Sequence, residues 1–294
     1  MKKRLILHIG MHKTGSTSIQ RFFSRNRRLL GLLGLCYPIS IGPDGRRQPK
    51  HNAIFSAISH EADFGAAHPA LGPSANLIDS VAEEIARAPG RTAVMSAEGF
   101  SGERPVFAQA LAPLARRFDV TIVMFVRRQD LWVESFYKQM VQSREVRLAD
   151  PFAAFLSRPE TAAHMDYATI AAWWADAFSG RIVVSPFEPD IDATTPLSLF
   201  LRAADLSPRL AWAPYARARE NPSPPTALIE QIRQANADGR ESAPDANQRR
   251  GEVGAYLSQS ERIQLMNRYD PGNRDLLRYL RSPQRRRLFL QPII

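Results

Sequence analysis

The chain of 294 residues contains one cysteine, Cys36, and no long apolar run. A single cysteine excludes an intrachain disulfide and any metal site built from several cysteines. No apolar stretch approaches the ~20 residues that a helix needs to cross a bilayer. The apolar stretch that follows Lys2, Lys3 and Arg4 is too short for a secretory signal, so we expect a cytoplasmic protein.

Acidic residues are scarce relative to basic ones, with 29 Asp and Glu against 39 Lys and Arg and a net charge of +10. Such an excess favours anionic partners: nucleic acid, an acidic membrane surface, or a phosphorylated or sulfated small molecule. The basic residues occur in short groups, such as Arg127-Arg128 and Arg285-Arg286-Arg287, and not in one block. Charge alone therefore selects none of these partners.

Short apolar runs alternate with segments of helical periodicity from the first residues to about residue 205. The runs at 4–9, 92–96, 120–126 and 181–185 have the length of strands that are buried on both faces of a sheet. Helical spacing follows them, as at Val133, Phe136, Tyr137 and Met140. This alternation predicts a three-layer α/β/α fold around a central, mainly parallel sheet.

Beyond about residue 207 the composition changes, because prolines become frequent and residues 238–251 are mostly polar. Helical spacing returns at 227–236, 258–268 and 274–280. We expect one domain over residues 1–294, with a core of about 1–205 and a helical carboxyl-terminal cap of about 206–294.

The segment Gly10–Thr17 carries the strongest functional signal. Its two glycines lie five residues apart and are followed by hydroxyl residues and a predicted helix, which is the frame of a phosphate-binding P-loop. In such a loop, backbone N–H groups and the helix dipole attract an anion. Nucleoside triphosphatases place a lysine directly after the second glycine, whereas this chain has Ser16 there and its lysine, Lys13, within the loop. No clear strand-end aspartate for magnesium follows, so the pattern favours a metal-free site for an anion less charged than ATP.

Two segments resemble the nucleotide-binding elements of sulfotransferases that use 3′-phosphoadenosine 5′-phosphosulfate (PAPS). Residues 8–20, His-Ile-Gly-Met-His-Lys-Thr-Gly-Ser-Thr-Ser-Ile-Gln, resemble the 5′-phosphosulfate loop of that family. Residues 123–137 resemble its 3′-phosphate element, in which an arginine at a strand end is followed eight residues later by a serine. Arg127 and Ser135 have this spacing, and Arg128 is the alternative choice for the arginine. Residues 220–223 resemble a late Asn-x-Ser element near the nucleotide, although a proline-rich turn explains them equally well. The resemblance implies a P-loop-type fold, PAPS as donor, PAP as product, no metal, and a nucleotide site formed by His12, Lys13, Thr14, Gly15, Ser16, Thr17, Ser18, Arg127, Ser135, Asn221 and Ser223.

Sulfuryl transfer also needs a base for the proton of the acceptor. Glu98 follows the predicted strand 92–96, at the edge where open parallel sheets bind ligands. It resembles the strand-end glutamate that carbohydrate sulfotransferases use as a base. His51 is a second candidate, because some members of the family use histidine. Lys13 completes the candidate catalytic set, since its charge can stabilise the leaving 5′-phosphate.

The sequence therefore predicts a PAPS-dependent sulfotransferase that transfers a sulfuryl group to a hydroxyl or amine acceptor by in-line displacement. Carbohydrates, lipid-linked sugars and small alcohols are all open as acceptors, and we expect the acceptor pocket to involve residues 36–75 and 140–165. We expect no nucleic-acid partner. Two alternatives are a P-loop kinase or nucleotide hydrolase, and a basic protein that binds polyanions.

Overall fold

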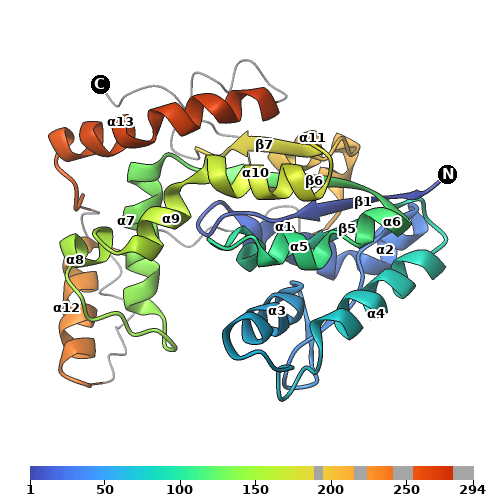
Figure 1. Cartoon of the computed structure of the whole chain (residues 1–294), viewed down its shortest axis with the longest axis horizontal. Coiled ribbons are helices and arrows are strands. Elements are labelled where there is room, and N and C mark those ends of the chain that lie inside the picture. The colour runs from blue at the N-terminus through green and yellow to red at the C-terminus, as the bar shows by residue number, and fades with distance from the viewer. Residues whose placement is uncertain (189–194, 215–223, 241–253, 281–294) are drawn as a thin grey trace.

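The computed structural model describes residues 1–188, 195–214, 224–240 and 254–280. Five parallel strands form its central sheet, in the order β2-β5-β1-β6-β7 (Figure 1). Their bounds are β1 Lys3–His8, β2 Leu35–Cys36, β5 Thr92–Ser96, β6 Phe118–Val126 and β7 Ile182–Pro186. A separate antiparallel hairpin consists of β3 Ser40–Ile41 and β4 Arg47–Gln48.

The strand order makes β1 the point at which the topology changes direction. The chain first leaves β1 toward β2 and β5 on one side, and later adds β6 and β7 on the other. Ligands bind to open α/β sheets at such a switch point, beyond the carboxyl ends of the strands. The segments after β1, β5 and β6 are therefore the ones that matter for function.

Both faces of the sheet are buried, which explains why its strands are apolar runs and not alternating patterns. Leu5 and Leu7 point into the larger hydrophobic cluster, while Ile6 between them points into a smaller cluster on the opposite face. The smaller cluster is covered by α1 Ser16–Arg25, α2 Arg27–Leu32, α11 Pro196–Ala203 and the short 3₁₀ helix η2 Pro208–Trp212. The larger cluster is covered by α3 Asn52–Phe64, α4 Ser74–Arg87, α5 Val106–Leu111, α6 Leu114–Arg117, α7 Gln129–Gln142 and α10 Tyr167–Ala177. The predicted α/β/α layering around a parallel sheet is confirmed.

Further helices extend this core on the side of α7 (Figure 1). They are α8 Phe152–Leu156, α9 Pro159–Met165, α12 Thr226–Ala237 and α13 Gln259–Asp275. The helix α12 packs on α7, and α13 packs on both α7 and α10. A 3₁₀ helix, η4 Leu276–Tyr279, then leads to Leu280, which forms a parallel bridge with Val184 in β7. Within the described residues, no helix has the length and apolarity required to cross a membrane.

Candidate functional site

The segment between β1 and α1 forms a tight turn, which we call the anion turn (residues 10–17). Gly10, Lys13 and Gly15 all have positive φ angles, of 23°, 63° and 79°. A Cβ added to Gly15 would lie 2.4 Å from Pro196 Cγ, so this position requires glycine both for its conformation and for its contact with α11. The helix α1 begins at Ser16 without a side-chain cap or an acidic residue in its first turn. Its first amides and positive dipole end therefore suit an anion.

The side chains of the anion turn divide into two groups. Thr14 is fully buried, and its hydroxyl donates to the carbonyl of Met11 at 2.6 Å. Ser16 is also buried, with its Oγ at 3.5 Å from the same carbonyl. In contrast, Lys13 and Thr17 are exposed, and Ser18 is half-buried. The two buried hydroxyls stabilise the turn, whereas Lys13 and Thr17 lie at the surface where a ligand can reach them.

A polar network beneath the turn connects it to the rest of the sheet. The imidazole of His8 bonds through Nδ1 to Ser96 Oγ at 2.8 Å, and Gln20 donates to the same hydroxyl at 3.2 Å. Burial lowers the pKa of His8 to about 4, despite the opposing effect of Glu98. On the other side of the turn, the indole of Trp132 in α7 donates to the carbonyl of His12 at 3.0 Å. Sequence analysis identified none of these supporting contacts, because each joins residues that are far apart in the chain.

Glu98 opens a 3₁₀ helix, η1 Glu98–Ser101, two residues after β5 ends. Its Oε2 lies 3.2 Å from Nδ1 of His12, so the predicted base meets a residue of the anion turn. Burial pushes the pKa of Glu98 up, but the adjacent His12, with the charge of Lys50, outweighs this and holds the pKa below its ordinary value. The ring of His12 also stacks on Phe136 at 5.3 Å. Glu98 is therefore an ionised carboxylate beside the anion turn.

His51, the other candidate base, lies in a different environment. It is fully buried, its Nδ1 accepts the backbone N–H of Ser96 at 3.1 Å, and its Nε2 bonds to the carbonyl of Pro38 at 3.2 Å. Burial lowers its pKa to about 4, against the opposing effect of these backbone contacts. Nδ1 thus holds the segment before α3 against the end of β5, and Nε2 holds it against the segment between β2 and β3.

The two adjacent arginines at the end of β6 have different surroundings. Arg128 is buried, and its Nε lies 3.2 Å from Asp130, which also contacts Arg262 at 3.3 Å. Arg127 is only partly buried, with its Nε 4.0 Å from Glu188. Ser135 is half-buried on α7. Asn221 and Ser223, which the sequence places near the nucleotide, lie outside the described residues.

Glu188 is a candidate that sequence analysis missed. It is buried two residues beyond β7, and its Oε1 accepts the backbone N–H of Arg128 at 2.7 Å. Burial raises its pKa to about 7, although that hydrogen bond and the charges of Arg127 and Arg128 oppose the shift. Glu98 follows the end of β5 by the same two residues, so a carboxylate just past a strand was the available signal.

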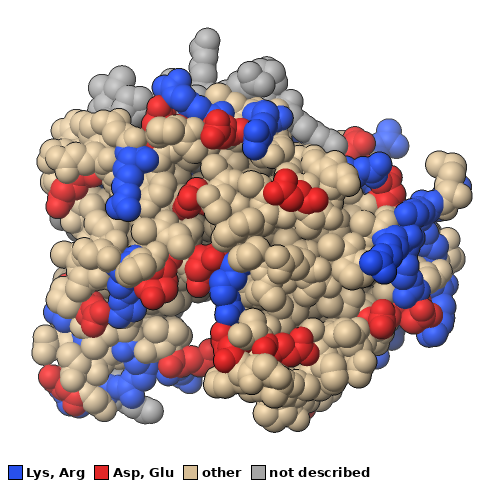
Figure 2. Space-filling model, viewed as in Figure 1, with Lys and Arg blue, Asp and Glu red and all other residues tan. Residues whose placement is uncertain are grey.

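The anion turn, Glu98 and Arg127 lie at one edge of the sheet. His8, the last residue of β1, is in register with Ser96 of β5 and Val123 of β6. The anion turn, Glu98 and Arg127 therefore follow three adjacent strands at their carboxyl ends. Figure 2 shows the molecule hollowed between the region of α8 and α12 and the region of α3, with acidic and basic side chains on the walls.

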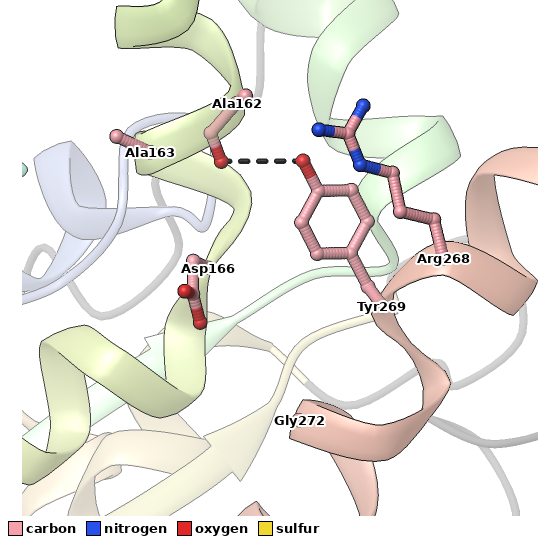
Figure 3. A pocket seen from close by; sticks show the side chains of 6 residues that line it. All are labelled: Ala162, Ala163, Asp166, Arg268, Tyr269 and Gly272. Atoms are coloured by element: carbon pink, nitrogen blue, oxygen red, sulfur yellow. Dashed lines mark hydrogen bonds between the residues drawn. The ribbon is translucent and has the colours of Figure 1, made fainter.

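A separate hollow of about 470 Å³ lies between α13 and the α9–α10 connection (Figure 3). The hydroxyl of Tyr269 donates to the carbonyl of Ala162 at 3.2 Å across it, and Asp166 and Arg268 contribute charged side chains. No residue of the predicted site is among the described residues that line this hollow.

The chain is similar to known proteins in structure, whereas its sequence gives no match. No protein-family model matches the sequence, and no curated protein matches it. The chain is similar in structure to sulfotransferases over nearly its full length, at low sequence identity. The mouse sulfotransferase SULT7A1 complexed with PAP matches 98% of this chain and 88% of its own, at 13% identity and a TM-score of 0.42. The sulfotransferase domain from the curacin biosynthetic pathway matches 91% of this chain and 96% of its own, at 13% identity and a TM-score of 0.39.

A third similar structure comes from a chromosomal toxin–antitoxin system, PezAT of Streptococcus pneumoniae. It matches 81% of this chain and 87% of its own, at 10% identity and a TM-score of 0.31. At such identities and TM-scores, the geometry of the site itself must carry the functional argument.

Proposed function

We propose that this chain is a PAPS-dependent sulfotransferase that acts on a hydroxyl or amine acceptor. One observation carries the proposal: an anion turn, a glutamate in contact with His12 of that turn, and an arginine follow three neighbouring strands at the same edge of the sheet. This arrangement offers a positive site for a sulfuryl donor beside a carboxylate that can accept a proton. The resemblance of residues 8–20 and 123–137 to sulfotransferase motifs supports the same interpretation.

The anion turn would hold the 5′-phosphosulfate end of the donor. The positive φ angles of Gly10, Lys13 and Gly15 keep the backbone curved around the start of α1, where the first backbone amides of the helix can bind an anion. The exposed Lys13 would add a full positive charge, while the buried Thr14 and Ser16 hydroxyls keep the turn in shape. When bound, PAPS supplies an activated sulfuryl group with the 5′-phosphate as leaving group.

Arg127, with Ser135, would hold the 3′-phosphate at the other end of the donor. Arg127 is the better candidate of the two adjacent arginines, because Arg128 is buried and committed to Asp130. A guanidinium at this position can bind a phosphate through two parallel hydrogen bonds. Asn221 and Ser223 stay a sequence-based prediction for this end of the site.

Glu98 would take the proton of the acceptor. Its pKa is held below the ordinary value, so the carboxylate is free of a proton at neutral pH. His12, within the anion turn, lies 3.2 Å from Glu98 and would orient the carboxylate toward the acceptor. His51 is less suited to this role, since both of its ring nitrogens already bond to backbone groups.

Substitution of Lys13 tests the catalytic half of the proposal. Lys13→Ala removes a charge that stabilises the developing negative charge on the leaving phosphate, so turnover should fall by about a hundredfold or more. Its thermal midpoint should change little because Lys13 is exposed. Sulfate transfer from labelled PAPS to a mixture of acceptors measures turnover, and an unchanged rate would remove Lys13 from this role.

Ligand-dependent thermal stability tests the donor class. A sulfotransferase should be stabilised by 3′,5′-ADP in the presence of EDTA, because a ligand stabilises the state that it binds. A kinase or nucleotide hydrolase should instead be stabilised by ATP with magnesium. Stabilisation by ATP with magnesium and none by 3′,5′-ADP would contradict the proposal and support the alternative.

A further inference from the structure

The short helix α2 exposes an unusual concentration of leucine. Leu30 is fully buried in the smaller hydrophobic cluster and anchors the helix to the sheet. Its neighbours point outward: Leu29 is 39% exposed, Leu32 is 86% exposed and Leu33 is 62% exposed. No other five-residue segment in the described part of the chain has three large hydrophobic side chains this exposed.

An exposed tryptophan lies in the segment next to this helix. Asn26, the residue before α2, donates through its side chain to the carbonyl of Pro214, two residues after η2 ends. The side chains of Leu210 and Ala213 pack on the cluster that contains Leu30, so η2 covers the same face of the sheet. Trp212, the last residue of η2, is 83% exposed. Tryptophan is enriched at membrane–water interfaces, where its ring is apolar and its N–H is solvated.

Basic residues precede the exposed leucines in the chain. The first acidic residue of the chain is Asp44, and the 43 residues before it carry only basic charges, at Lys2, Lys3, Arg4, Lys13, Arg21, Arg25, Arg27 and Arg28. Arg25 and Arg28 are exposed on either side of the start of α2. Glu84 of α4, which contacts α2, pairs with Arg27. We call the surface formed by Arg25, Arg28, Leu29, Leu32 and Leu33 the leucine–arginine patch.

A cavity of about 390 Å³ adjoins the patch, between α2 and the end of α4. Arg28 and Arg87 line it, together with the pair formed by Arg27 and Glu84. Arginine binds phosphate groups with fixed, often bidentate geometry. The cavity thus offers a place for a phosphate at Arg28, the residue that it shares with the patch.

We propose that the leucine–arginine patch docks the protein on a membrane surface that contains anionic phospholipid. Leu29, Leu32 and Leu33 would enter the interfacial layer, while Arg25 and Arg28 contact lipid phosphates. The positive charge of the patch favours an anionic membrane over a second copy of the chain as the partner. A symmetric dimer through this patch would bring the same arginines of both copies together, which is unfavourable, whereas anionic lipid complements them.

The patch lies at the opposite edge of the sheet from the proposed site. Leu35 directly follows the α2 region and pairs with Thr92, the first residue of β5. The anion turn, Glu98 and Arg127 lie at the other ends of the strands, as Figure 1 shows for the directions of β1 and β5. A protein docked through α2 would keep the site open to the aqueous phase. The docking proposal therefore does not depend on the sulfotransferase proposal.

Vesicle flotation of the full chain tests the docking proposal. We expect the protein to float with vesicles of equal parts phosphatidylcholine and phosphatidylglycerol, and to float much less with phosphatidylcholine alone. Leu32→Asp combined with Leu33→Asp should abolish flotation. Phe64→Asp is the matched control, because Phe64 is an equally exposed apolar residue (71%) on α3, and it should float normally.

Arg28→Glu tests the electrostatic part of the docking proposal. Each unit of charge near an anionic surface changes the binding constant about fivefold, so this reversal of two units should weaken binding roughly thirtyfold. The proposal would be overturned if the double leucine variant floats as well as the wild type. It would also be overturned if the wild type floats equally well with and without phosphatidylglycerol. A concentration-dependent dimer that the leucine substitutions dissociate would overturn it as well, because the partner would then be a second copy. The thermal midpoint of each variant without ligand reports on its folding, and the shift of that midpoint by 3′,5′-ADP reports separately on the sulfotransferase proposal.

Discussion

Replacing Gly15 by alanine should destabilise the protein through two separate effects. The φ angle of 79° is a left-handed conformation that costs an L-residue about 1–2 kcal/mol. In addition, the new Cβ would lie 2.4 Å from Pro196 Cγ, so α11 or the anion turn must shift. Overpacking of this kind costs about 1–3 kcal/mol. The two effects together predict a loss of about 2–5 kcal/mol in the free energy of unfolding.

Gly45 provides a control that isolates the contact with Pro196. Its φ angle is 71°, and a Cβ at this position would meet no atom within 4 Å. Gly45→Ala should therefore lose only the conformational part, about 1–2 kcal/mol. Urea unfolding of the two variants and the wild type measures the difference, provided that the m-values agree.

The two variants should also differ in ligand binding. Gly15→Ala deforms the anion turn, so it should reduce the thermal stabilisation by 3′,5′-ADP, whereas Gly45→Ala should not. If Gly15→Ala is no less stable than Gly45→Ala and binds the nucleotide normally, then the close contact between the anion turn and α11 does not shape the site.

Three further predictions concern charged residues of the site. Arg127→Ala should reduce retention on immobilised 3′,5′-ADP, whereas Arg128→Ala should mainly lower stability, by about 1.5–3 kcal/mol, because the buried Asp130 loses one of its two arginine partners and keeps Arg262. The reverse pattern would assign the phosphate to Arg128. Glu98→Gln should lower turnover by about a hundredfold or more and leave nucleotide binding intact, and a rate near that of the wild type would exclude Glu98 as the base. Burial raises the pKa of Glu188 from its ordinary 4.5 to about 7, so Glu188 keeps its proton to higher pH in the folded than in the unfolded chain. The stability that this proton contributes is complete below pH 4.5 and is lost as the pH rises through 7. Glu188→Gln should remove this loss. Between pH 4.5 and pH values above 7, the free energy of unfolding of the variant, measured with urea, should therefore gain roughly 3 kcal/mol relative to that of the wild type. A difference in stability between variant and wild type that does not change with pH would contradict the raised pKa.

The sequence predicted the buried strands well because their apolar runs have no competing interpretation. The run 92–96 coincides with β5, and the run 120–126 lies within β6. Short strands could not be predicted, because so few residues show no hydrophobic pattern. The strand β2 has only two residues, and its pairing with β5 in the structure is what identifies it. The segment 106–117 has continuous helical spacing, but Pro113 separates α5 from α6 because proline lacks the N–H that a continuous helix needs.

Local motifs likewise predicted the positions of the site residues but not their contacts. The glycine spacing identified the anion turn, and the strand-end position identified Glu98. The contact between His12 and Glu98 joins residues that only the pairing of β1 with β5 brings together. The same holds for the bonds of His51 to Ser96 and Pro38, which depend on how a loop packs on the sheet. The roles of Lys13, Arg127 and Ser135 stay predictions that the experiments above address.

The central claim is that one site binds an adenosine nucleotide at both ends, through the anion turn and through Arg127. Calorimetric titration of the wild type and of Arg127→Ala with 5′-AMP and with 3′,5′-ADP, all in EDTA, tests it most directly. The wild type should prefer 3′,5′-ADP over 5′-AMP by about tenfold or more, as expected for a charged hydrogen bond to the 3′-phosphate. Arg127→Ala should bind both nucleotides equally weakly. An equal affinity of the wild type for both nucleotides, or a preference that survives in Arg127→Ala, would contradict the claim.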